Sequence, residues 1–84
     1  MNLKLPIKLN YYRNKIVKLE DEADRLSWLW ADGKFSNVTY IKYLRSMSLD
    51  FTKKYLALKY GVSNDYFSDD ELITKRDEIK WELL

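Results

Sequence analysis

A long stripe of apolar residues in the first third of the chain limits the folds that are open to it. The stripe recurs at alternating intervals of four and three residues, which keeps its side chains on one face of an α-helix. Its members are Tyr12, Ile16, Leu19, Ala23, Leu26 and Trp30. The pattern predicts a helix over residues 10–32. Gly33 is expected to end it, because glycine takes the left-handed conformation after a last helical turn with little strain.

The apolar stripe has to be buried against another apolar surface, and two such surfaces are available. It packs against the next helix of the same chain, or it pairs with the same stripe of a second copy in a homodimer. The stripe is short for a coiled coil, and further apolar helices follow it in the chain. Packing within the chain is therefore the preferred interpretation, and a homodimer through the stripe is the alternative.

A second helical pattern covers residues 38–60, after a turn in which Ser36 or Asn37 is expected to cap the new helix. Apolar residues fall on two sides of this segment rather than on one. Either the helix breaks at residues 48–50, where a polar side chain would cap a new start, or it is central and covered from two sides. We expect a break or kink at these residues.

The third helix is predicted to begin at Ser68. Ser68 and Glu71 have the spacing of a capping box, in which each side chain bonds the backbone N–H of the other residue. Asp69 and Asp70 follow in the first turn, where the helix dipole favours negative charge. The helix is expected to continue to the end of the chain, at or near Leu84.

The first nine residues alternate between apolar and polar side chains, which is the period of a half-buried strand. Pro6 restricts such a strand to an edge, and no second strand pattern follows. Residues 1–9 are therefore predicted to form an extended arm beside a single helical domain of residues 10–84. The predicted fold is all-α: a compact bundle of three to four helices, built as a helical hairpin plus a C-terminal helix, with an extended N-terminal arm. The expected core comprises Ile16, Leu19, Leu26, Trp30, Leu44, Phe51, Tyr55, Leu58, Ile79 and Leu83.

The stretch of residues 57–63 has the residue pattern found at the centre of many DNA-binding helix-turn-helix motifs, with Gly61 at the turn. A recognition helix after it would present several carboxylates to phosphates, against the attraction that supplies most non-specific DNA affinity. The stronger helix start at Ser68 also makes residues 63–67 a loop. Gly61 is therefore interpreted as the end of an ordinary helix.

The chain has few residues that could carry out catalysis, because it contains no His, no Cys and only two glycines. It therefore lacks the commonest proton shuttle, the best nucleophile and any glycine-rich phosphate loop. Its acidic clusters, residues 20–24 and 69–71, are contiguous in sequence, so their carboxylates fan around a helix instead of converging on a metal or a substrate. We expect no enzyme, no catalytic residue, no cofactor and no metal site.

Charges alternate in blocks along the chain, although the net charge is only +2. Residues 21–33 and 61–84 are mainly acidic, whereas residues 1–20 and 34–60 are mainly basic. This arrangement suits a chain whose acidic and basic faces meet when it folds. It suits a nucleic-acid-binding protein less well, because such a protein gathers one sign of charge on one surface.

Aromatic residues make up 15% of the chain, more than a small core needs, which points to a contact surface. Trp28 lies almost opposite Trp30 on the first helix, so the two indoles do not share the stripe. Trp28 either meets a partner protein or packs with Val17 beneath Trp81 or Leu5. Tryptophan and tyrosine are frequent interface hot spots. The candidate partner-binding residues are Trp28, Tyr60, Asp65, Tyr66, Asp69, Asp70 and Trp81.

These observations predict a small non-enzymatic protein that binds another protein. Its composition, free of Cys and rich in Lys, Tyr, Asn and Ile, is typical of stoichiometric inhibitors or adaptors. Phages and mobile elements of low-GC bacteria encode such proteins to block a host enzyme or a defence nuclease. There is no long apolar run and no signal-like segment, so a cytoplasmic protein with a host protein as partner and no membrane contact is expected.

The alternative function is a small DNA- or RNA-binding regulator, helix-turn-helix-like or dimeric. It would use a lysine-rich face of residues 42–59. Its candidate residues are Lys42, Arg45, Lys53, Lys54 and Lys59. A phosphate-binding face should lose affinity steeply with added salt, whereas an aromatic interface should hardly respond.

Overall fold

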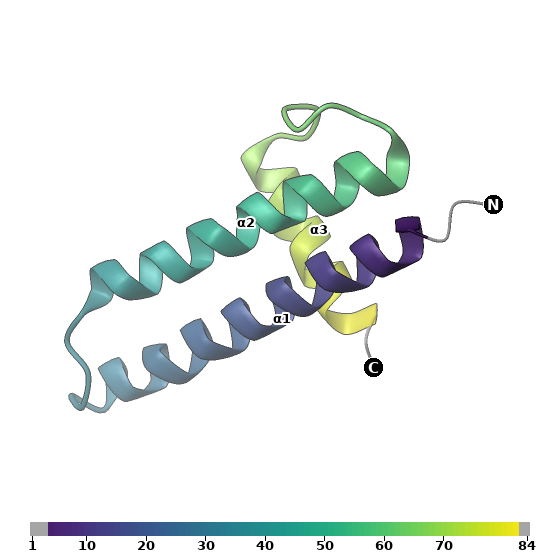
Figure 1. Ribbon diagram of the computed structural model, residues 1–84. Helices are drawn as coiled ribbons and strands as arrows, with labels where there is room; N and C mark the ends of the chain where they lie inside the picture. The colour runs from purple at the N-terminus through teal and green to yellow at the C-terminus, as the bar shows by residue number, and fades with distance from the viewer. Residues whose placement is uncertain (1–3, 83–84) are drawn as a thin grey trace.

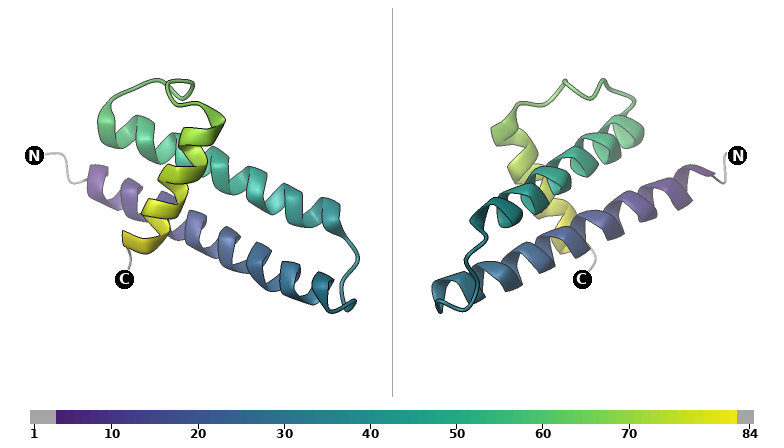
Figure 2. Two further views of the ribbon diagram at one scale, coloured as in Figure 1. Left: turned by 180° about the vertical axis from the view of Figure 1, so that it is seen from behind. Right: turned by 60° about the vertical axis from the view of Figure 1, so that its left-hand side comes forward.

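The computed structural model describes residues 4–82, and these residues form three α-helices and no strand. Helix α1 spans Lys4–Ala31, α2 spans Val38–Tyr60 and α3 spans Asp69–Glu82. Helices α1 and α2 lie side by side as an antiparallel hairpin (Figure 1). Helix α3 crosses one face of this hairpin, on the half that lies away from the turn between α1 and α2 (Figure 2). The predicted all-α fold, a helical hairpin plus a C-terminal helix, is confirmed.

Local signals set the ends of the helices. Asn37 caps α2, and its side-chain oxygen accepts a hydrogen bond of 3.0 Å from the backbone N–H of Tyr40. Gly33 and Gly61 follow α1 and α2 with φ of 74° and 68°, the left-handed region that other residues enter with strain. The backbone N–H of Gly61 donates to the carbonyl of Ala57 at 2.9 Å. Residues 57–61 are thus the end of a helix, as predicted.

The capping box at the start of α3 is formed as the sequence predicts. The backbone N–H of Glu71 donates to the Ser68 hydroxyl at 3.3 Å, and the Glu71 carboxylate accepts from the Ser68 backbone N–H at 3.4 Å. Asp69 and Asp70 lie in the first turn. The start of α3 is therefore determined by Ser68 and Glu71, which lie within one helical turn of each other.

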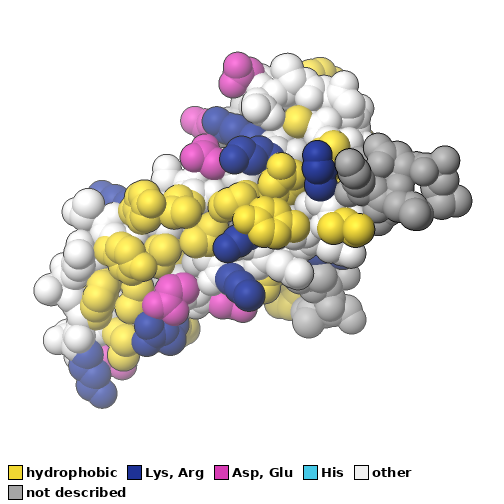
Figure 3. All heavy atoms as spheres, in the orientation of Figure 1, with side chains coloured by type: hydrophobic (Ala, Val, Ile, Leu, Met, Phe, Trp, Pro, Cys, Tyr) yellow, Lys and Arg dark blue, Asp and Glu magenta, His cyan; other side chains and the backbone are white. Residues whose placement is uncertain are grey.

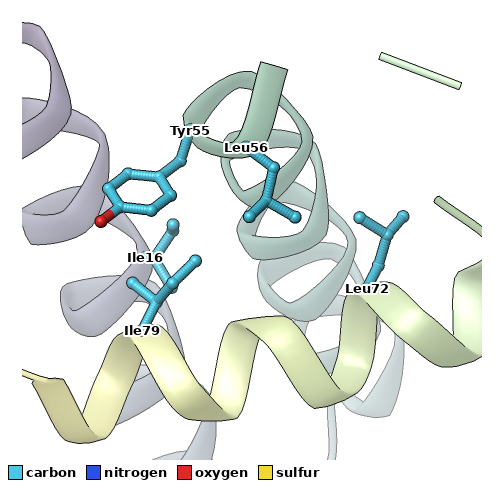
Figure 4. Close-up of a cluster of buried hydrophobic side chains, with 5 residues drawn as sticks. All are labelled: Ile16, Tyr55, Leu56, Leu72 and Ile79. Atoms are coloured by element: carbon cyan, nitrogen blue, oxygen red, sulfur yellow. The ribbon is translucent and has the colours of Figure 1, made fainter. Parts of the chain in front are cut away.

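The core divides into two clusters along the hairpin. Where α3 crosses, all three helices contribute: Ile16 comes from α1, Tyr55 and Leu56 from α2, and Leu72 and Ile79 from α3 (Figure 4). Nearer the turn, only α1 and α2 contribute. This second cluster comprises Ala23, Leu26, Ile41 and Leu44. The stripe of α1 therefore packs within its own chain, and a homodimer through it would require residues that this fold already buries.

The N-terminal segment corrects one prediction. Helix α1 begins at Lys4, so residues 4–9 are helical and not part of an extended arm, while residues 1–3 lie outside the described residues. Pro6 falls in the first turn of α1. A proline is tolerated there because the backbone N–H groups of the first turn have no acceptor within the helix. The apolar residues read as an alternating strand thus extend α1 instead.

Helix α2 corrects a second prediction, because it runs without a break through residues 48–50. Ser48 and Thr52 are fully buried, and the Thr52 hydroxyl donates to the Ser48 carbonyl at 2.9 Å. The Thr52 hydroxyl is thus satisfied on the preceding turn, whereas the buried Ser48 hydroxyl has no hydrogen-bond partner among the described residues. Of the two alternatives, α2 is the central helix that is covered from two sides, by α1 and by α3.

The expected core is only partly correct. Trp30 is 54% exposed, because it lies in the last turn of α1, where α2 offers only its first turn as cover. Leu19, Phe51 and Leu58 are partly buried, and Leu83 lies outside the described residues. The other expected core residues, Ile16, Leu26, Leu44, Tyr55 and Ile79, are buried.

Candidate functional site

The partner-binding residues suggested by the sequence are all exposed, but they do not form one surface. Trp28 and Trp81 have 75% and 67% of their surface exposed, so Trp28 is not packed beneath Trp81. Trp28 lies on α1 near the hairpin turn, whereas Tyr60 and the loop before α3 lie at the opposite end of the hairpin (Figure 1). The side chain of Leu5 lies outside the residues whose burial is described.

Part of the predicted set does gather at the α2–α3 loop. Tyr60 and Tyr66 line a shallow hollow of about 370 Å³ together with Val62, Phe67 and Lys75. The rings of Tyr66 and Phe67 meet edge to face with centroids 5.0 Å apart. The acidic residues of the prediction that flank this loop, Asp65, Asp69 and Asp70, are exposed.

The lysine-rich face of residues 42–59 is not a single free surface. Arg45 turns toward α1, where its guanidinium donates to the carboxylates of Glu20 and Asp24, each at 2.9 Å. Lys59 lies over the rings of Tyr55 and Tyr60, each with its ammonium 5.5 Å from the ring centroid. Of the other candidates, Lys42 and Lys54 are exposed and Lys53 is half-buried. Arg45, the strongest phosphate ligand of the set, is therefore engaged within the fold.

A network of ion pairs joins the three helices on the face that α3 covers. At its centre is Glu20, whose side chain is 3% exposed. Its Oε1 atom lies 2.9 Å from Nη1 of Arg45 in α2 and 3.2 Å from Nε of Arg76 in α3. Its second carboxylate oxygen, Oε2, has no hydrogen-bond partner. Two guanidinium groups from different helices thus compensate one buried carboxylate, which ties both helices to α1.

The network continues at the next turn of α1. Asp24 lies 2.8 Å from Nζ of Lys80, which also approaches Asp21 at 3.6 Å. Partial burial acts to raise the pKa of Asp24, but hydrogen bonds from Lys80 and Arg45 outweigh it and hold this pKa below its ordinary value. The Asp24 hydrogen bond raises the pKa of Lys80. The contact of Asp24 with Arg45 joins an acidic block to a basic one, as the alternating charges predict, whereas Lys80 is a basic residue of the mainly acidic last segment.

Within residues 4–82, no third helix covers the opposite face of the hairpin. Figure 3 shows hydrophobic side chains in a nearly continuous band over α1 and α2, on the face of the hairpin that points away from α3. We define the aromatic band as Tyr11 and Tyr12 of α1 together with Tyr40, Tyr43, Met47 and Phe51 of α2. The Phe51 ring centroid lies 6.4 Å from that of Tyr11 and 6.1 Å from that of Tyr12, so the band bridges the two helices. Tyr11 and Tyr43 remain 52% and 56% exposed.

The register of α2 explains why these residues lie opposite α3. Leu56 packs on Leu72 and Ile79 of α3. Phe51 precedes Leu56 by five residues, which turns it about 140° away around the helix. Met47 and Tyr40 precede Phe51 by four and eleven residues, close to one and three helical turns, so they share its side.

Lysines border the band at the end where the chain enters α1. The ammonium group of Lys15 lies 5.6 Å from the Tyr11 ring centroid, and that of Lys54 lies 5.3 Å from the Phe51 ring centroid. A hollow of about 340 Å³ opens between the two helices there, and its lining includes Lys8. Among the described residues, no ion pair joins Lys8, Lys15 or Lys54 to a carboxylate. The remaining lining residues are Tyr12, Lys54, Ala57, Leu58 and Asn64.

Sequence reasoning missed the aromatic band because it left Tyr11, Tyr40 and Tyr43 without a role and considered Phe51 only as a core residue, although its partly buried ring both packs on the core cluster and contacts Tyr11. One signal could have found it. Helix α2 has apolar residues on two sides, while the last helix has few apolar residues to cover them. A three-helix chain with such a central helix leaves one of the hairpin faces open.

Comparison of the chain with protein-family models, with curated proteins and with solved structures gives no match. Within residues 4–82, no helix combines the length and the apolar character that crossing a bilayer requires. The same part of the chain holds no cluster of three or more acidic side chains placed to bind a metal ion.

Proposed function

We propose that this is a non-enzymatic protein that binds another protein through the aromatic band and acts stoichiometrically, as an inhibitor or an adaptor. The observation that carries the proposal is the open face of the hairpin. Tyrosines Tyr11, Tyr40 and Tyr43 keep roughly half of their surface in water there, around a cross-helix contact with Phe51. Exposed aromatic clusters of this kind supply large contact area with little side-chain entropy to lose.

The opposite face supports this proposal by making the band a stable platform. Glu20, Arg45 and Arg76 hold the three helices together there, and the apolar cluster around Leu56 fills the space between them. A partner therefore meets side chains on a preformed helix pair and does not have to order a loop. Preformed surfaces lose less entropy on binding than mobile ones.

The cellular setting is part of the same proposal. We propose a cytoplasmic protein of the kind that phages or mobile elements encode to block a host enzyme or a defence nuclease. The composition supports it: the chain lacks Cys and is rich in Lys, Tyr and Asn.

A nucleic-acid-binding regulator is the second candidate. Lys15 and Lys54 stand beside exposed aromatic rings, a combination that also binds single-stranded nucleic acids. Arg45, however, is engaged with Glu20 and Asp24, which removes the one arginine of the suggested phosphate-binding set. Protein binding is therefore the better-supported function.

The test is an affinity capture from lysate of a low-GC bacterium, with and without nuclease, followed by mass spectrometry. The wild type is compared with a Tyr11→Ala/Tyr43→Ala variant of the band and with a Trp28→Ala control, whose exposed indole lies off the band. We expect one nuclease-resistant protein that the wild type and the control retain and the band variant loses. Retention by the band variant would contradict the proposal, and loss of all partners with nuclease would favour the nucleic-acid reading.

A further inference from the structure

We infer that the segment seated on the aromatic band is an acidic amphipathic helix of the partner protein. This inference rests on the proposed function, because it takes the band as a protein-binding surface and names the chemistry of its occupant. The shape of the open face, the charges along its border and the side chains of the band itself all support this occupant.

The shape of the open face suits a helix. The aromatic band is an apolar surface that spans both helices, and the apolar face of a third helix packs on such a surface by ridge-into-groove contacts. Beside the band lies the hollow of about 340 Å³, which Tyr12 of α1 and Leu58 of α2 help to line. A large apolar side chain from the partner helix fits there as an anchor. Because α3 covers one face of the hairpin, such a helix would cover the other face, and the hairpin would lie between them.

The border of the band is basic. On α1, Lys8 and Lys15 are two turns apart on one side, next to Tyr11. On α2, Lys54 stands over Phe51. Two carboxylates lie near this border. Glu22 of α1 is paired with Arg25 at 2.6 Å, and Asp50 of α2 has no ion-pair partner among the described residues.

These lysines are placed to select a partner by charge. The ammonium groups of Lys15 and Lys54 lie over the rings of Tyr11 and Phe51, so positive charge stands directly beside the apolar surface. A helix that buries its apolar face on the aromatic band brings its flanking side chains to these ammonium groups. Glutamates or aspartates there gain complementary contacts, whereas lysines meet like charge at short range. The border thus favours an acidic helix over a basic one.

The apolar side chains argue against a nucleic acid as the occupant. Ala57 and Leu58 give the hollow an aliphatic lining that has nothing to offer a phosphate or the edge of a base. The basic groups at its border are lysines, and the bidentate contacts that arginine makes with phosphate are missing. An apolar helix face uses all of these features at once.

Two fluorescein-labelled synthetic helices of equal length test the inference by fluorescence anisotropy. They share leucine and phenylalanine anchors on one face and differ only in their flanking positions, which carry glutamate in one peptide and lysine in the other. We expect the acidic peptide to bind at least about tenfold more tightly at low salt. We expect the Lys15→Glu/Lys54→Glu variant to reverse this preference. A charge-matched control, Lys42→Glu/Lys75→Glu, changes one lysine about 140° away from the band on α2 and one on α3, and should leave the preference unchanged.

Four outcomes overturn the inference. One is equal binding of both peptides, and another is binding of neither. The third is a labelled thymidine oligonucleotide that binds tightly and loses this binding in the Lys15→Glu/Lys54→Glu variant. The fourth is a dimer in light scattering that this variant converts to a monomer, which would make a second copy the occupant. The capture experiment separates these failures from failure of the proposed function, because it reads dependence on Tyr11 and Tyr43 without any assumption about charge.

Discussion

The two faces of the α1–α2 hairpin differ in what they leave to solvent. On the face that α3 covers, Leu56, Leu72 and Ile79 are closed off from water, and the buried carboxylate of Glu20 is compensated by two arginines. On the other face, the rings of Tyr11 and Tyr43 stay about half exposed, and Lys15 and Lys54 lie over aromatic rings without a carboxylate partner among the described residues. Folding stability and partner binding are therefore expected to depend on different faces of the same two helices.

The largest effect should come from the covered face. Leu56→Ala removes a fully buried side chain from the cluster that joins all three helices, and we expect a loss of about 2–5 kcal/mol in the free energy of unfolding. Urea denaturation followed by circular dichroism measures it. A loss below about 1 kcal/mol would mean that α3 is not packed as described and that the two faces do not differ in this way.

Removing the central charge of the network should have the next largest effect. Glu20→Gln leaves Arg45 and Arg76 facing a neutral group, and we expect a loss of about 1–3 kcal/mol in the free energy of unfolding. Glu22→Gln is the matched control, because Glu22 pairs only with Arg25 at the surface, and it should change nothing measurable. Equal losses of unfolding free energy for the two substitutions, measured by urea denaturation, would mean that the ion-pair network does not stabilise the fold.

Acid should weaken the covered face through Asp24. The pKa of Asp24 lies below its ordinary value of 3.8 in the folded chain, so its ion pairs stabilise the fold at neutral pH. This contribution is lost in acid, as the pH falls from the ordinary pKa through the lowered pKa of the folded chain. The pKa of Lys80 is raised, so its contribution is present at neutral pH and is lost only as the pH rises above the ordinary value of 10.5. We expect Asp24→Asn to be less stable at pH 7 and to lose less stability in acid. Parallel urea midpoints of variant and wild type across the acid range would contradict this.

The smallest effect on stability should come from the open face. Tyr43→Ala and Trp28→Ala both truncate exposed rings, and each should change the free energy of unfolding by less than about 0.5 kcal/mol. The two variants should differ in partner capture, which Tyr43→Ala weakens and Trp28→Ala leaves intact. A loss of more than about 1 kcal/mol for Tyr43→Ala would place its ring in the core and erase the difference between the faces.

Both ends of α2 and the start of α3 were readable because their signals act within one turn, whereas the start of α1 was predicted six residues too late. Asn37, Gly61, Ser68 and Glu71 form their caps with residues at most four positions away, and the predicted helix of residues 38–60 has the observed bounds. The α1 stripe was readable for a similar reason, because helical periodicity alone places Ile16, Ala23 and Leu26 on one face. None of these inferences needed to know which helix lies opposite.

The tertiary structure decided which apolar faces are covered. Phe51 and Leu56 are equally apolar in the sequence, yet α3 covers Leu56 and leaves the side of Phe51 open. Helix α2 runs without a break through Ser48, which the fold buries fully although its side chain is polar. The partners of Glu20 come from positions 25 and 56 residues further along the chain. Such contacts depend on how whole helices stack, and their energy is distributed over the bundle, so no single stretch of sequence contains it.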